Sequence, residues 1–275
     1  MSETVAPEAI QKLSRDLRKA AADIGVREAR YFVSAYYDLQ DYRIASANQQ
    51  RKLLEGNEPS ELITWLNGNL EILEKQIQAM LDKWSAHQHM GIWARAICGI
   101  GPVISSGLLA NIDITRAPTV GHIWSFAGLN PTAKWEKGEK RPWNASLKRL
   151  CWLIGESFVK VSSNKNDVYG KVYLERKAYE VGNNESGKLA EQARERAAQK
   201  TRRAIDPELL ELLKSGKLPP KALHERAKRY AVKLFLSDWH AEAYRHHYGK
   251  EPPLPYPIAI LGHAHVRDPI TRLKP

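Results

Sequence analysis

The feature that most constrains this chain is a strict apolar spacing between positions 63 and 84. Steps of three and four residues separate Ile63, Leu66, Leu70, Leu73, Ile77, Met80 and Trp84. This is the period of one helix face, and such a face is stable only when another element covers it. Ser60 predicts the start of this helix, and the segment from about 26 to 54 predicts a long helix before it. With only about three heptads, both an intramolecular hairpin and a homodimer through the Ile63–Trp84 seam stay open.

Helical patterns dominate the rest of the chain, so we expect a mainly α fold. Further helices are predicted from about 7 to 22, 188 to 204, 207 to 216 and 221 to 248, with a polar linker at 182–187. The proline-rich end after residue 250 favours an extended segment. We expect three regions: a helical, coiled-coil region (1–89), a compact helix-hairpin-helix domain (90–181), and basic helices with a proline- and histidine-rich tail (188–275).

The net charge of +11 is concentrated in two blocks. Residues 134–177 hold eleven Lys and Arg against five Asp and Glu, and residues 188–233 hold thirteen against six. Fixed cations of this kind favour a polyanion, most often nucleic acid, because they displace counterions from phosphates. A solvated basic face without a partner is the alternative.

The two cysteines, Cys98 and Cys151, are too few and too isolated for a disulfide framework or a CxxC zinc site. They fit a reducing cytoplasm. The first ten residues lack the pattern of a signal peptide, and no apolar run approaches the roughly 18 residues of a membrane span. We therefore expect a cytoplasmic protein.

A glycine turn, Gly99-Ile100-Gly101, lies between a predicted helix at 90–98 and another at 103–112. Glycine allows positive φ and lets backbone N–H groups approach a phosphate, and the second helix would present its positive N-terminus there. Ile100 is expected to anchor the turn in the core. The pattern predicts a helix-hairpin-helix phosphate grip, with a plain αα-hairpin as the alternative.

The next segment supplies cations. Lys134, Lys137, Lys140 and Arg141 form a predicted glycine-containing loop, and Ser146 is expected to cap a helix that begins with Lys148 and Arg149. Trp135 and Trp143 flank this loop; they suit stacking on an unpaired base, although packing at the rim of the core is the commoner role. Further basic residues extend the track on a later helix: Arg194, Arg196, Arg202 and Arg203.

Together, GIGPVISSGLLANI, FAGLNP, a basic loop with glycine, and SLKRLCWLI resemble the C-terminal half of the insertion-sequence one-ten group of transposases, which are guide-RNA-using DNA recombinases. The resemblance covers about residues 26–160. Ala127, Gly128, Leu129 and Pro131 match the family's turn, Gly138 with Lys140 matches its loop, and Cys98 stands where the family usually has proline. The resemblance implies DNA binding, with RNA as a possible partner.

Two departures concern the chemistry of that family. Only about 25 residues precede the matching helices, so we expect its acidic resolvase-like domain to be absent. The loop KWEKGEK at 134–140 has no serine to act as the family's nucleophile. We expect a transposase-derived DNA-binding protein without catalysis; the alternatives are an active transposase or metal-dependent nuclease, or a binder of structured RNA.

Histidines crowd the C-terminal part of the chain. His240 and His247 share a helix face, and His263 and His265 are two residues apart. With Asp238 or Glu242 they offer donors for a divalent metal, but the spacing matches no known metal motif. Packing or surface roles are the preferred interpretation, and no cofactor is expected.

Overall fold

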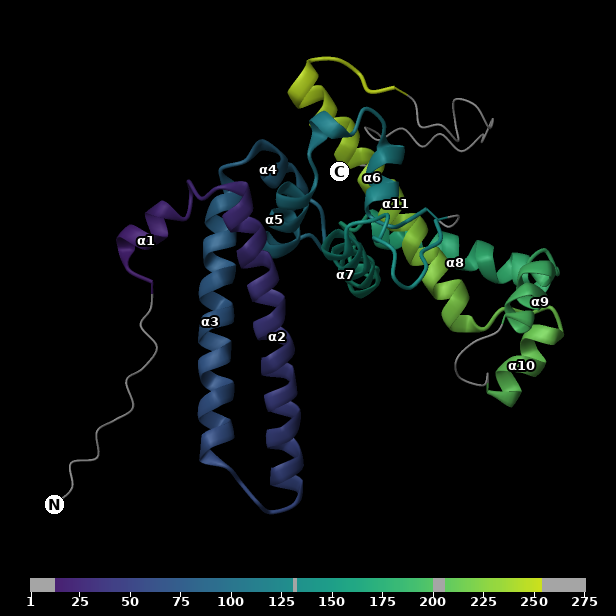
Figure 1. Ribbon diagram of the computed structural model, residues 1–275, viewed down its shortest axis with the longest axis horizontal. Helices are drawn as coiled ribbons and strands as arrows, with labels where there is room; N and C mark the ends of the chain where they lie inside the picture. Colours follow the sequence, from purple (N-terminus) through teal and green to yellow (C-terminus); the bar gives the residue numbers. More distant parts are fainter. Residues whose placement is uncertain (1–12, 131–132, 200–205, 254–275) are drawn as a thin grey trace. The chain divides into compact units, whose positions relative to one another are not determined.

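The computed structural model describes residues 13–130, 133–199 and 206–253, and within them every extended regular element is a helix (Figure 1). The mainly α expectation is confirmed. The helices are α1 (Arg15–Ala20), α2 (Val26–Glu55), α3 (Glu61–Ala86), α4 (His89–Arg95), α5 (Pro102–Asn111), the 3₁₀ helix η1 (Ile114–Arg116), α6 (Val120–Phe126), α7 (Ala145–Val161), α8 (Tyr169–Glu185), α9 (Ala190–Ala198), α10 (Pro207–Lys214) and α11 (Pro220–Tyr248). None of these helices is both long enough and apolar enough to cross a bilayer.

The chain divides into two compact units. Unit 1 comprises residues 1–96 and 101–113, and unit 2 comprises residues 97–100 and 114–275. These bounds differ from the three regions expected from the sequence, because α8 and α11 pack together across the expected boundary at 181–188.

Unit 1 is built on a hairpin of α2 and α3, two long helices that lie side by side (Figure 1). Polar contacts join them along their length: Ser46 Oγ donates to Asn67 Oδ1 at 3.0 Å, and Gln50 Nε2 donates to Thr64 Oγ1 at 2.9 Å. Ser60 caps α3 as predicted, its side chain accepting from the Ile63 amide. The hairpin alternative is therefore present within one chain.

The predicted seam on α3 is covered unevenly. Trp84 is buried and Ile63 is half-buried, whereas Leu66 is exposed. A homodimer through this helix stays a prediction. The first helix is shorter than expected, since α1 begins at Arg15 behind its cap Ser14; positions 7–12 of that prediction lie outside the described residues.

Unit 2 has an aromatic core where α7, α8 and α11 meet. The rings of Phe158, Tyr169 and Phe235 lie 5.0 to 5.5 Å apart, and the Tyr169 hydroxyl donates to Asp238 Oδ2 at 2.7 Å. Burial of these large side chains fixes α11 against α7 and α8, which positions the charged residues on the outer faces.

The polar linker predicted at 182–187 is wrong. Helix α8 continues to Glu185, and the side chain of Asn184 is buried. Its amide oxygen accepts from the Leu218 N–H at 2.9 Å and its NH₂ donates to the Leu218 carbonyl at 3.1 Å. This polar segment can stay helical because the backbone of Leu218 forms hydrogen bonds with the buried side-chain amide of Asn184.

Candidate nucleic-acid interface

The glycine turn between α4 and α5 has a different role at each glycine. Gly99 has φ +90°, and a Cβ there would lie 3.1 Å from both Ser157 Oγ and Val161 Cγ2. Ile100 is buried, as predicted. Gly101 has φ −91°, and no atom would lie within 4 Å of an added Cβ. Only Gly99 therefore requires glycine.

The turn offers fewer backbone donors than expected. Pro102, the first residue of α5, has no N–H. Ser157 Oγ donates to the Gly99 carbonyl at 2.5 Å, which fixes the turn on the C-terminal half of α7. Gly99 and Ile100 belong to unit 2, whereas Gly101 belongs to unit 1.

The structure does not bring this turn and the predicted cations together. Gly99 contacts α7 at Ser157, whereas Lys148 and Arg149 lie near the start of the same helix. Nine residues of helix correspond to about 13 Å along its axis. The single cradle predicted from the sequence thus becomes two separate places on α7.

The basic loop is exposed. Lys134, Lys137, Lys140 and Arg141 face solvent, and the chain turns at Gly138, which has φ +101°. Trp135 stabilises the turn, because its Nε1 donates to the Glu139 carbonyl at 2.8 Å and its ring lies 4.9 Å from the Arg141 guanidinium. The loop presents its cations around an indole that is 39% exposed.

The start of α7 is capped by Asn144, and the prediction of Ser146 as the cap is wrong. The Asn144 side chain accepts from the Leu147 amide at 2.8 Å, and Ser146 is an exposed residue of the first turn. The predicted cap is two residues too late. Both Asn and Ser are good N-cap residues, but Asn144 is the one with the extended backbone that an N-cap position requires.

Gly128 fixes the position of the side chains next to this cap. It has φ +64°, and an added Cβ would lie 2.9 Å from Trp143 Cγ and 3.0 Å from Lys148 Cδ. The Lys148 ammonium lies 4.1 Å from the centre of the Trp143 ring. The Ala127-Gly128-Leu129 turn therefore holds an indole and a cation together at the start of α7.

A cavity of about 370 Å³ opens beside this pair. The α6–α7 side contributes Gly128, Trp143, Lys148 and Trp152, and α11 contributes Glu225, Lys228 and Arg229. Trp152 is 53% exposed. The cavity therefore combines two indoles, cations and one carboxylate.

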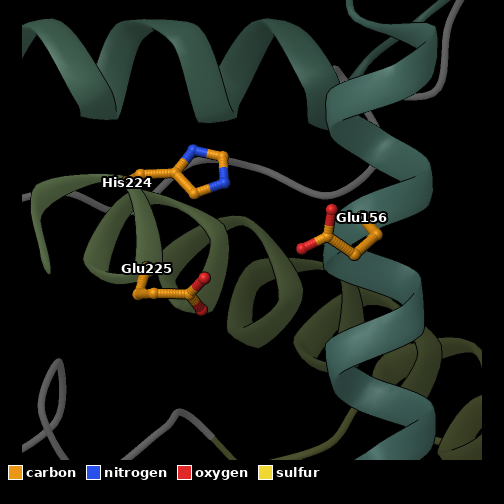
Figure 2. A group of neighbouring side chains, drawn as sticks. All are labelled: Glu156, His224 and Glu225. Carbon is orange, nitrogen blue, oxygen red and sulfur yellow. The ribbon is translucent and has the colours of Figure 1, made fainter. Parts of the chain in front are cut away.

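Glu156, His224 and Glu225 form a cluster, drawn in Figure 2, with ligand atoms within 4.8 Å of one another. Of the three, Glu225 also lines the cavity. The donor set suits a divalent metal. However, the Lys228 ammonium already pairs with Glu156, and with Glu225 at 2.7 Å. Burial alone would lower the pKa of Lys228, but these hydrogen bonds outweigh it and raise the pKa. A metal ion would have to displace a strongly held ammonium.

Two cations on α11 lie close together without such compensation. Lys233 Nζ lies 4.2 Å from the centre of the Trp124 ring, and in the described part of the chain it forms no ion pair. Burial, and then the positive charge of Arg229, lower the pKa of Lys233. Such an uncompensated positive field is what a phosphate group would relieve.

A second cavity, of about 540 Å³, adjoins the first. Glu225 and Arg229 line both, and Arg196, Lys221 and Arg226 line the second. The two hollows therefore share part of their walls. We call the cations that lie in these walls, or one turn beyond them on α11, the α11 track (Lys148, Arg196, Lys221, Arg226, Arg229 and Lys233). Arg194 is exposed on α9, and Arg202 and Arg203 lie outside the described residues.

The position of His240 does not support the metal site that the C-terminal histidines suggested. Its side chain is buried, and its Nε2 is 2.8 Å from the Ala117 carbonyl, so that this nitrogen carries a proton and cannot be a ligand. Burial lowers the pKa of His240. His247 is exposed, and His263 and His265 lie outside the described residues.

The cysteines are both free thiols. Cys151 lies in the wall of the first cavity, where burial raises its pKa to about 12. A thiol that stays protonated is a weak nucleophile, so the cavity wall is unreactive at this position.

Sequence reasoning missed Lys221, Arg229, Lys233 and Trp152, which the structure places in or near the two cavities. The signal for the three cations was the four-residue spacing of Lys221, Glu225, Arg229 and Lys233, which places them on one face of a helix. Comparisons with known proteins found no matching family model, curated protein or solved structure.

Proposed function

We propose that this protein binds nucleic acid, DNA in preference to RNA, through the sugar-phosphate backbone and with little sequence specificity. The α11 track of unit 2 supplies the cations, and the loop at 134–141 extends them. The proposal keeps the kinship to the transposase family that the sequence motifs imply, and it assigns the chain no catalytic step.

One observation carries the proposal: Arg229, which lines both cavities, and Lys233, one turn further along α11, lie close together and form no ion pair in the described part of the chain. Surfaces that bind single-stranded nucleic acid typically combine cations, which contact the backbone, with aromatic side chains, on which bases stack. Among the described residues of unit 2, four tryptophans have a cation near the ring: Trp124 has Lys233, Trp135 has Arg141, Trp143 has Lys148, and Trp152 has Lys228.

The test is the salt dependence of binding to a duplex of mixed sequence. Lys148→Glu and Arg229→Glu are each expected to weaken binding and to reduce the slope of log K against log salt by about one, because each lost phosphate contact releases one counterion fewer. Lys52→Glu is the matched control, since Lys52 is an exposed lysine of unit 1.

Equal slopes for all four proteins would overturn the assignment of the α11 track. A structured RNA of the same length serves as the competitor. If RNA displaces the duplex at equal concentration, the preference for DNA is wrong, although the same cations still bind phosphate.

A further inference from the structure

The 370 Å³ cavity beside α7 has a composition that backbone binding alone does not require. Its volume lies at the lower end of the roughly 300–1,000 Å³ typical of small-ligand pockets. A phosphate grip needs cations on an open surface, whereas this hollow also exposes an indole and a carboxylate. We propose that it holds one unpaired base of a nucleic-acid strand whose backbone lies on the α11 track; this inference rests on the proposed function.

Trp152 is the platform for such a base. Trp152 lines the cavity and is 53% exposed, so part of this large apolar residue is open to solvent. Each of the two indoles of the cavity has one ammonium near its ring: Lys148 lies 4.1 Å from the centre of the Trp143 ring, and Lys228 lies 5.5 Å from the centre of the Trp152 ring. Stacking on an indole is available to every base, because every base has a π face.

Glu225 gives the cavity a preference among bases. Its Oε1 pairs with Lys228, yet 37% of its side chain is exposed, so the carboxylate can still be reached. A carboxylate accepts a hydrogen bond from an amino group such as N4 of cytosine, whereas thymine has a carbonyl oxygen at that position. The geometry favours an amino-bearing base in the cavity.

The cations in the cavity wall position the nucleic-acid strand by contacting its phosphates. Lys148 and Arg229 line the same cavity as Trp152, one on α7 and one on α11. The phosphates on either side of a base that leaves the stack can contact these two side chains while the base enters. A continuous duplex cannot do this, because its bases are stacked and paired.

The test compares a fully paired duplex with the same duplex carrying one bulged cytosine, at one salt concentration, by fluorescence anisotropy. The wild-type protein is expected to bind the bulged duplex about tenfold more tightly. Trp152→Ala is expected to bind the two duplexes equally tightly, so that the ratio of the two affinities falls to about one. The matched control is Trp65→Ala, which removes an indole that is 55% exposed in unit 1 and should keep the tenfold difference.

The outcomes separate the two proposals. If the wild-type protein binds both duplexes equally tightly, or if Trp152→Ala keeps the difference, the base pocket is wrong and the proposed function stands. If neither duplex binds, both are wrong. A bulged thymine bound as tightly as a bulged cytosine would overturn the role of Glu225. Circular dichroism melting of each variant confirms that it is folded.

Discussion

At the scale of single residues, the two glycines of the turn differ in how well they would tolerate a side chain. Gly99→Ala is expected to lower the free energy of unfolding by about 1–2 kcal/mol, because a side chain is strained at φ +90° and its Cβ would crowd Ser157 and Val161. Gly101→Ala should change it by less than about 0.5 kcal/mol, since its φ is ordinary and the space is open. Urea unfolding measures both. Equal losses would show that the turn differs from the geometry described.

Glu74 makes the α2–α3 hairpin sensitive to acid. Burial alone would raise its pKa, but hydrogen bonds from Arg43 and Gln40 outweigh burial and lower the pKa below 4.5. A depressed carboxyl pKa stabilises the folded state above the unfolded value and loses that contribution as the pH falls through the folded value. The melting temperature of the wild-type protein should therefore fall more steeply below pH 4.5 than that of Glu74→Gln. Parallel curves would contradict this.

At the scale of elements, the cap of α7 decides how firmly the start of the interface is held. Asn144→Ala is expected to cost about 1 kcal/mol of stability, because the Leu147 amide loses its acceptor. Ser146→Ala, two residues later, should cost almost nothing, since its side chain is exposed in the first turn. Thermal unfolding of the pair is the measurement. A larger loss for Ser146→Ala would restore the cap predicted from the sequence.

At the scale of the whole molecule, charge is divided between the two units. Unit 1 holds twelve Lys and Arg against fourteen Asp and Glu, and unit 2 holds thirty against seventeen. Binding to a polyanion should therefore depend on where a charge is removed, as local fields are screened beyond about 10 Å at 0.1 M salt.

Elution from immobilised heparin, a sulfated polysaccharide, tests this division. Lys148→Glu with Arg229→Glu should elute at clearly lower salt than the wild-type protein. Arg51→Glu with Lys52→Glu changes the net charge by the same amount within unit 1 and should elute close to the wild-type position. Equal shifts would mean that total charge alone governs binding.

Several of the helices and some of their ends could be predicted from the sequence, whereas α6 and α8 were not among the helices expected. The local signals are the spacing from Ile63 to Trp84, Ser60 as the cap of α3, and the start of α10 at residue 207. A helix is specified by residues three and four apart and by the groups that satisfy its first amides. Ile100 in the core of the turn followed from the same kind of reasoning.

Tertiary structure alone decided which of these elements meet. Asn184 stays helical because Leu218 satisfies its amide, and Gly99 contacts α7 far from Lys148, so the predicted phosphate cradle is divided. The α11 track exists because an aromatic core of Phe158, Tyr169 and Phe235 holds α11 against α7 and α8. Local periodicity determines which face of a helix is apolar and must be buried. Which element covers that face depends on the shapes of side chains that are distant in the sequence, and the spacing of apolar residues does not specify those shapes.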